Sequence, residues 1–446
     1  MTDRAYGFEN YAPRDLEIVD TTLREGAQTS VLHDYAKYAF ETADKVEIVR
    51  ALILYGVKFI ELFSPSVHPK ERDDLEAIRE TRDGLVTQTG YTFLLAHVRC
   101  HPDDVAAAIE AGVDGLNLFF GTSLMSRRHS HGKGLEDVAR SARDLIASIR
   151  RDHPHLILRF SGEDAFRTPI DELCRVYDPI VELVDRLGVP DTVGIATPDA
   201  VRRRMGELAG RYPEAEWEGH FHDDRGFATI NAMAAIHAGV RYMNTTVLGV
   251  GERSGIPSVT GLLFNLFVEG RHRLIDGYCL AESYPLNVLV ADKLRMLVND
   301  KEPVSLTNRT HTAGIHQKAV LNDATTYEAH PLDRFGVSEA EILLGPLSGW
   351  NVVHYFLKEI HYFDLDEDTA RRITVAFKEC VLADDPQERP ADLLLRLARD
   401  EFGLSQLEIP QWHRDGVLQN LAGPKRAHVG SRRFSCNAAN GPSIAT

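Results

Sequence analysis

Two histidines stand two positions apart in the run EGHFHDD, residues 218 to 224. In an extended strand, residues i and i+2 point to the same face, so His220 and His222 would face one way and Phe221 the other. Two imidazoles with one carboxylate can hold a catalytic divalent ion and leave positions open for substrate oxygens. The alternative is a strand whose histidines are satisfied by neighbouring backbone groups, and for a lone His-x-His this alternative is the more common one.

The fold that would supply this carboxylate is indicated by a repeated pattern between residue 16 and about residue 270. A short apolar run, a loop and a segment that in most units has helical periodicity recur along this stretch. Eight alternating units over about 250 residues favour a closed (β/α)8 TIM barrel, because open doubly wound sheets more usually have six strands. No GxGxxG motif follows the first run, which argues against a dinucleotide-binding fold. The predicted strands are 16–23, 57–64, 92–98, 115–121, 156–162, 191–196, 216–222 and 242–249.

Active sites of such barrels lie where the strands end. The first predicted strand is followed by Arg24 and Glu25, and the seventh ends in His220 and His222. The ligand set of such a metal site would be Glu25, His220 and His222, and only the family resemblance described below makes this interpretation preferred over histidines satisfied by backbone groups. Mg²⁺, Mn²⁺, Fe²⁺, Co²⁺ and Zn²⁺ are all compatible with this ligand set.

The rest of the chain departs from the barrel pattern. We expect an N-terminal arm over 1–15, the catalytic barrel over 16–285, and a mostly helical C-terminal subdomain over 286–405 that acts as a lid or dimerisation unit. Residues 406–446 are predicted to be a tail. Its end is small, polar and basic with little apolar periodicity, which is typical of disorder.

Bulk composition excludes several classes of function. The formal net charge is -16, from 66 acidic and 50 basic residues, which argues against nucleic acid or an anionic membrane as the main partner. No run reaches the roughly 18 apolar residues that span a bilayer, and the first residues lack the basic and apolar regions of a signal peptide. The five cysteines have no CxxC spacing, so neither a disulfide framework nor a thiolate zinc site is indicated. A cytoplasmic protein is predicted.

Four motifs together carry a family resemblance: DTTLREGAQ (20–28), HFHDD (220–224), GVGERSGIPSVTGL (249–262) and HTAGIHQKA (311–319). In this order they resemble the acyl-CoA-condensing barrels related to isopropylmalate synthase and homocitrate synthase. Homocitrate synthase is the closer match, because isopropylmalate synthases usually have aspartate where Glu25 stands and carry a large C-terminal regulatory domain.

This resemblance implies a metal-dependent Claisen condensation. Acetyl-CoA would react with an anionic 2-oxo acid and release coenzyme A, in an acyltransferase that converts the acyl group into an alkyl group and works as a homodimer. Arg24 would polarise the 2-oxo group, and Glu218 would lie near the site. His316 and Tyr327 would reach over the active site of the partner subunit and assist deprotonation of acetyl-CoA. The positions that match ligands of the oxo acid's carboxylates are His97, Arg159, Ser161 and Thr192.

Other interpretations stay open at this point. Ser161 and Thr192 lie where helix N-caps are expected, and capping is compatible with substrate binding. Related barrels cleave hydroxymethylglutaryl-CoA, but those lyases resemble one another in a cysteine within the loop after the last strand, which here reads GVGERS over 249–254. A catalytically silent barrel that acts as a binding subunit would need none of the metal-site residues. Condensation is therefore preferred.

The oxo acid is suggested by departures from the homocitrate synthase pattern. Phe63 replaces a threonine, Gly162 replaces a serine, and Asn117 stands where lysine-inhibited members tend to have aspartate. A shorter pocket with cationic donors such as Arg99 favours 3-phosphonopyruvate, giving 2-phosphonomethylmalate, as in phosphonate antibiotic biosynthesis. The alternatives are 2-oxoglutarate, which would make a homocitrate synthase, and oxaloacetate. Loss of the carboxylate at Asn117 argues against feedback control by lysine.

Overall fold

The computed structural model describes residues 15–34, 40–338, 340–383 and 388–407. Contacts divide the chain into two units between Val304 and Ser305. The predicted boundary near residue 285 falls inside the first unit, because α12 (Ser283–Lys293) contacts α2 (Thr42–Tyr55) of the barrel. The predicted arm up to residue 14, and the predicted tail from residue 408 on, lie outside the described residues.

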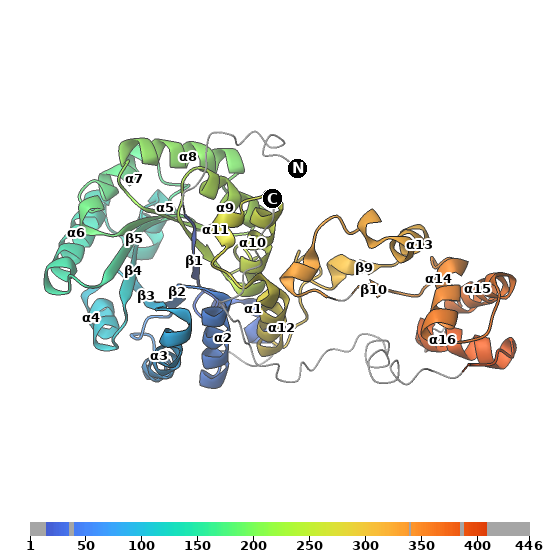
Figure 1. The fold of residues 1–446 in the computed structure, drawn as a ribbon. Helices are drawn as coiled ribbons and strands as arrows, with labels where there is room; N and C mark the ends of the chain where they lie inside the picture. Colours follow the sequence, from blue (N-terminus) through green and yellow to red (C-terminus); the bar gives the residue numbers. More distant parts are fainter. Residues whose placement is uncertain (1–14, 35–39, 339, 384–387, 408–446) are drawn as a thin grey trace. The chain divides into compact units, whose positions relative to one another are not determined.

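The first unit is a closed barrel of eight parallel strands that follow one another in chain order (Figure 1). β8 pairs with β1 in parallel, with Thr245 opposite Asp20, and this pairing closes the barrel. The predicted (β/α)8 TIM barrel is confirmed. The strands are β1 (Glu17–Asp20), β2 (Phe59–Leu62), β3 (Phe93–Arg99), β4 (Gly115–Gly121), β5 (Ile157–Glu163), β6 (Arg186–Asp191), β7 (Trp217–Phe221) and β8 (Tyr242–Thr245).

The sixth strand was placed wrongly by the sequence pattern. We expected it over 191–196, but β6 ends at Asp191. The Asp191 carboxylate accepts the backbone N–H groups of Ile195 and Ala196 at 3.0 and 2.9 Å, which turns the chain into a loop. β6 escaped recognition because it starts with a buried charge, Arg186, and contains a proline.

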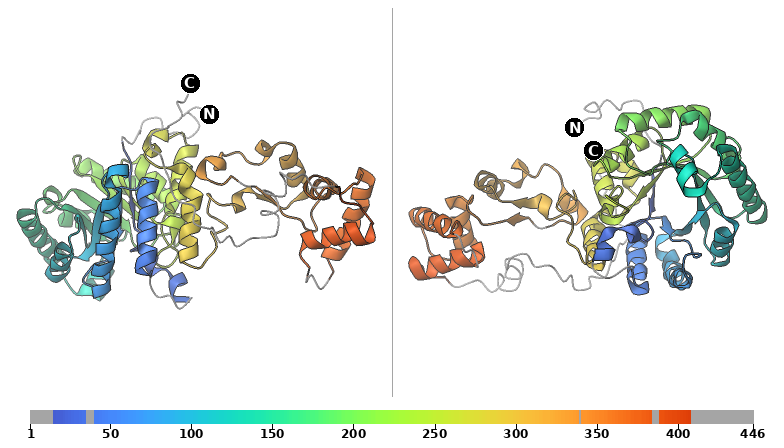
Figure 2. Two further views of the ribbon diagram at one scale, coloured as in Figure 1. Left: turned by 60° about the horizontal axis from the view of Figure 1, so that its bottom comes forward. Right: turned by 180° about the vertical axis from the view of Figure 1, so that it is seen from behind.

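Helices surround the strands on the outside, as the two views of Figure 2 show. α6 illustrates why they pack there: its residues Leu135, Val138, Ala142, Ile146 and Ile149 recur at helical spacing and are all buried. The barrel-unit helices are α1 (Ser30–Asp34), α2, α3 (Pro69–Thr89), α4 (Pro102–Glu110), α5 (Leu124–Ser126), α6 (Leu135–Asp152), α7 (Ile170–Tyr177), α8 (Pro198–Arg211), α9 (Ala228–His237), α10 (Val259–Val268), α11 (His272–Ile275) and α12.

The second unit is mostly helical, as expected, and has a small hydrophobic core of its own. Val353, Leu357, Ile373, Phe377 and Leu394 are among its buried residues. A two-stranded parallel sheet precedes this core in the chain. The elements are β9 (Thr310–His311), α13 (Gly314–Asn322), β10 (Glu341–Ile342), α14 (Trp350–Tyr355), α15 (Glu367–Val381) and α16 (Pro390–Arg396).

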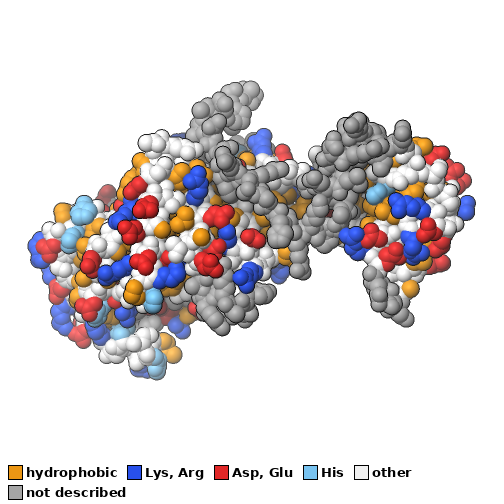
Figure 3. Space-filling model, turned by 90° about the horizontal axis from the view of Figure 1, so that it is seen from below, with side chains coloured by type: hydrophobic (Ala, Val, Ile, Leu, Met, Phe, Trp, Pro, Cys, Tyr) orange, Lys and Arg blue, Asp and Glu red, His pale blue; other side chains and the backbone are white. Residues whose placement is uncertain are grey.

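Two surface properties bear on the partners of the protein. In the part of the chain that the structure describes, no helix is long and apolar enough to cross a membrane. On the face drawn in Figure 3, acidic and basic side chains are interspersed rather than gathered into one patch.

Candidate metal and substrate site

The three predicted metal ligands meet at the carboxyl ends of β1 and β7. One ligand atom from each of Glu25, His220 and His222 lies within 4.8 Å of the other two. The Nε2 atoms of the two imidazoles are 3.2 Å apart, and His222 Nε2 is 3.9 Å from Glu25 Oε1. Two imidazole nitrogens at this distance cannot both carry a hydrogen, whereas a cation between them uses both lone pairs. The donor set therefore fits a divalent metal ion.

The electrostatics keep these side chains in the protonation states that bind metals. Burial, followed by the neighbouring imidazole, lowers the pKa of His220 to about 3, and burial also lowers the pKa of His222. Burial alone would raise the pKa of Glu25, but the Arg24 guanidinium and the two imidazoles bring it down to about 2. Neutral imidazole and ionised carboxylate are the forms that ligate a metal.

Two groups that the sequence analysis missed hold these ligands in place. Asn244 Oδ1 lies 3.1 Å from His220 Nδ1 and can accept its hydrogen, which leaves Nε2 free as a ligand. The backbone N–H of Glu252 donates to Glu25 Oε1 at 3.0 Å. A Cβ on Gly251 would lie only 3.0 Å from the Glu25 side chain, so the glycines of the GVGERSG loop allow this close approach.

A cavity of about 610 Å³ opens beside the three ligands. Arg24 lies in it with its guanidinium against Glu25, 2.7 Å from His97 Nε2 and 3.6 Å from Glu61 Oε1. Burial and the Arg24 charge lower the pKa of His97 to about 4, so the ring is neutral. The predicted substrate ligands that line the cavity are His97, Arg159, Ser161 and Thr192.

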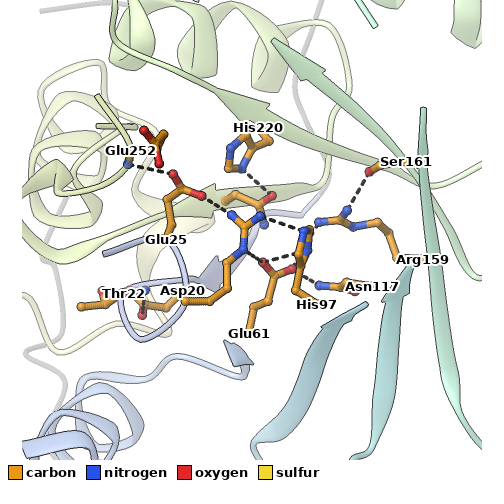
Figure 4. Close-up of polar contacts among 12 residues, drawn as sticks. Asp20, Thr22, Glu25, Glu61, His97, Asn117, Arg159, Ser161, His220 and Glu252 are labelled. Atoms are coloured by element: carbon orange, nitrogen blue, oxygen red, sulfur yellow. Dashed lines mark hydrogen bonds and ion pairs between the residues drawn. The ribbon is translucent and has the colours of Figure 1, made fainter. Parts of the chain in front are cut away.

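Glu61 is the hub of the polar network, and sequence reasoning missed it (Figure 4). Its carboxylate accepts the Asn117 amide and lies 3.3 Å from Arg159 Nη2 and 3.5 Å from His97 Nδ1. Burial alone would raise its pKa, but His97, Arg159 and Arg24 hold the pKa well below the ordinary value. The signal available was a single carboxylate inside the mostly apolar run VKFIELFS.

Glu163 is a second missed residue of the cavity. It follows Ser161 by two positions on β5 and lines the same space. Burial raises the pKa of its carboxyl group, and the neighbouring Asp164 adds to the effect. Such a carboxyl group takes up and releases a proton closer to neutral pH than an exposed one, which suits acid–base chemistry.

Two residues that the sequence analysis placed at the substrate site make other contacts. Glu218 does not line the cavity; it lies 2.8 Å from Arg159 Nη2 and 3.2 Å from Arg186 Nη1, and it accepts the Asn244 amide at 3.0 Å. The Arg99 side chain, 69% exposed, pairs with Asp104 at the rim. The Arg99 guanidinium is therefore paired at the rim of the cavity and not at its floor.

Three local expectations are corrected. Thr192 caps no helix, because α8 starts at Pro198 and is capped by Thr197. The Thr192 hydroxyl instead accepts a hydrogen bond from the Asp164 N–H at 2.9 Å. Ser161 lies inside β5 and accepts a hydrogen bond from Arg159 at 2.7 Å. Gly162 faces the helix layer, where a Cβ would lie 2.7 Å from Leu173, so its identity concerns packing rather than the oxo acid.

His316 and Tyr327 lie together in the second unit. Their ring centroids are 4.1 Å apart, His316 is exposed and Tyr327 is 43% exposed. The chain therefore presents an imidazole and a phenol side by side on the surface of this unit.

Comparisons with known proteins cover most of the chain. The family model described as HMGL-like matches residues 15–284, and the one described as Homocitrate synthase post-HMGL domain-like matches residues 304–385. A mitochondrial homocitrate synthase of Schizosaccharomyces pombe is 36% identical over 82% of this chain and 84% of its own length. A homocitrate synthase of Methanocaldococcus jannaschii is 31% identical over 82% of this chain and 86% of its own length.

A 2-isopropylmalate synthase of Rhodopirellula baltica is 29% identical over 91% of this chain and 75% of its own length. Among solved structures, a hydroxymethylglutaryl-CoA lyase from Pseudomonas aeruginosa aligns with a TM-score of 0.55 over 65% of this chain and 96% of its own, at 19% identity. At that identity the structural likeness concerns the fold alone.

Proposed function

The chain belongs to the isopropylmalate synthase and homocitrate synthase family of acyltransferases, and we propose that it condenses acetyl-CoA with 2-oxoglutarate, releasing coenzyme A and homocitrate. The observation that carries the proposal is the set Glu25, His220 and His222 beside a cavity lined by Arg24 and Arg159. A divalent ion on these ligands would supply Lewis acidity to the 2-oxo group.

The protein's own side chains account for the remaining needs of the reaction. Arg24 can donate to the oxygen that becomes an alkoxide, which requires its guanidinium to turn from Glu25 towards the substrate. Arg159 and Ser161, joined by a hydrogen bond of 2.7 Å, offer donors for a carboxylate. Thr192 at the cavity wall adds a hydroxyl.

A base must also remove a proton from the acetyl methyl group. Glu163 is a candidate within the cavity, because burial gives its carboxyl a raised pKa. We propose that His316 and Tyr327 act with it, delivered to the barrel of a partner subunit in a homodimer. The exposure of these two adjacent rings on their own unit supports the idea that a second surface covers them.

3-Phosphonopyruvate, which the sequence departures favoured, is the second candidate substrate. The relatives named above give it no support, since two of them are named homocitrate synthases and one is named a 2-isopropylmalate synthase. The observation in its favour is that Phe63 lines the cavity. A cytoplasmic location likewise stays a prediction, because the fission yeast relative is named mitochondrial.

The test is release of free thiol from acetyl-CoA with Mg²⁺ or Mn²⁺ against 2-oxoglutarate, 3-phosphonopyruvate, oxaloacetate and 2-oxoisovalerate. Turnover highest with 2-oxoglutarate supports the proposal, and turnover highest with phosphonopyruvate replaces it with the second candidate. A parallel assay with hydroxymethylglutaryl-CoA tests the lyase alternative. If no oxo acid releases thiol, the condensation proposal fails.

A further inference from the structure

A buried charged cluster lies next to the His316 and Tyr327 pair. Glu328, the residue after Tyr327, accepts from Arg309 Nε at 2.8 Å and lies 2.7 Å from Arg309 Nη2. The other carboxylate oxygen, Oε1, lies 3.5 Å from His311 Nε2. The Glu328 and His311 side chains are 9% and 11% exposed, so arginine, carboxylate and imidazole form a row largely shielded from water.

Two atoms of this row are left without a hydrogen bond. His311 Nε2 and Glu328 Oε1 are both buried and, within the described residues, neither has a partner that meets hydrogen-bond geometry. A buried polar atom left in this state costs about 1–3 kcal/mol. Because the two atoms are already 3.5 Å apart, a small rotation of the imidazole satisfies both at once. The arrangement therefore places a carboxylate and an imidazole where a small side-chain rotation forms a hydrogen bond between them.

The backbone of His311 is held firmly enough to aim its ring. Its carbonyl oxygen accepts from the Leu343 N–H on the neighbouring chain segment and from Gln317 Nε2, both at 3.0 Å. Gln317 is fully buried, also donates to the Leu343 carbonyl at 2.6 Å, and directly follows His316. One glutamine thus fixes β9 and the turn of α13 that carries His316.

We propose that Arg309, Glu328 and His311 form a positioning triad for the Tyr327 and His316 pair, an inference that rests on the proposed function. Once His311 Nε2 donates to Glu328, Nδ1 remains as an acceptor, which defines the tautomer of the ring. The His311 ring lies 6.4 Å from Tyr327 between centroids, and Tyr327 lies 4.1 Å from His316. Arg309 holds the carboxylate of Glu328 in place, and the triad sets the orientation of the surface pair.

Glu328→Gln tests the triad, because it keeps the size of the side chain and removes the charge. With 2-oxo acid and acetyl-CoA at saturation, kcat should fall about tenfold or more, the scale seen when an orienting partner is lost, while KM for the oxo acid stays within about twofold. The deuterium isotope effect with trideuterated acetyl-CoA should increase, because removal of the methyl proton becomes slower relative to other steps.

Glu341→Gln is the matched control. Glu341 lies on β10 of the same small sheet, and within the described residues its carboxylate accepts a hydrogen bond only from the Thr310 hydroxyl, at 3.4 Å. The Glu341→Gln variant should therefore have the same kcat and the same isotope effect as the wild type. His311→Asn is the second variant if Glu328→Gln fails to fold, because the contacts that hold position 311 use its backbone oxygen.

The outcomes separate the two hypotheses. Wild-type protein that releases no thiol with any oxo acid overturns the proposed function and the triad's role with it. Active wild type whose folded Glu328→Gln variant keeps normal kcat and isotope effect overturns the triad alone. Equal losses in the Glu328→Gln and Glu341→Gln variants would also overturn it, because they would point to general damage to the sheet.

Discussion

Replacing Asn117 with aspartate would put two carboxylates in contact inside the barrel. Asn117 and Glu61 are both buried, and the Asn117 amide donates directly to the Glu61 carboxylate. Two carboxylates in direct contact share one proton, because their repulsion prevents both from ionising. Glu61 is held ionised by His97, Arg159 and Arg24, so the new carboxyl group is the one that stays protonated.

The destabilisation follows from the work of keeping that group protonated. An unfolded aspartate has a pKa of about 3.9, and each pH unit above it costs about 1.36 kcal/mol. The expected loss is about 1.5 kcal/mol at pH 5 and about 4 kcal/mol at pH 7. The sign is that of a raised folded-state pKa: the loss vanishes below the unfolded pKa and grows as the pH rises towards the folded one.

Urea unfolding of wild type and Asn117→Asp at pH 5 and pH 7 measures this difference. The double variant Glu61→Gln with Asn117→Asp restores one donor and one carboxylate and should recover most of the stability at pH 7. An equal loss at both pH values, or no recovery in the double variant, would refute the reasoning about the shared proton.

Three further perturbations test the site. Glu25→Gln should abolish turnover and reduce the amount of metal bound to the protein, measured by elemental analysis after gel filtration. The circular dichroism spectrum should not change, and near-normal turnover would contradict the assignment of Glu25 as a metal ligand. His316→Ala should keep oxo-acid binding by calorimetry but lose exchange of the acetyl methyl protons with deuterated solvent, and unimpaired exchange would remove His316 from the chemistry. Burial raises the pKa of Asp20 to about 7, so wild type should lose stability between pH 4 and pH 8 through this group. Asp20→Asn should lose less in urea unfolding over that range, and parallel pH profiles would contradict the buried proton.

The sequence predicts what depends on local pattern. Alternation places His220 and His222 on one face of β7, and the position of Glu25 after the first strand predicts that it meets them. Glu61 and Asn244 were missed because their roles arise from contacts with other strands, which depend on the register of the closed barrel. Short-range periodicity carries no information on register across a barrel.

The error at β6 has the same origin. A buried arginine disqualifies a strand only if it has no partner, and Arg186 has Glu218 at 3.2 Å and the rings of Phe59 and Tyr242 at 4.9 and 4.4 Å. Those partners come from three other strands. The apolar stretch 191–196, where the pattern predicts a strand, instead contains Gly194 at φ +61°, a turn conformation.

The carboxylate of the metal site is held where the first and the last parts of the barrel sequence come together. Glu25 accepts a hydrogen bond from the N–H of Glu252, 227 positions further along the chain, and Thr22 accepts one from the N–H of Val247, 225 positions further along. Contacts so distant along the chain pay a large loop-closure entropy and tend to form late in folding. A nascent chain that has not yet extended past residue 252 therefore has Glu25 without its anchoring amide. Protein synthesis would have to complete nearly the whole barrel before a metal ion meets a finished site.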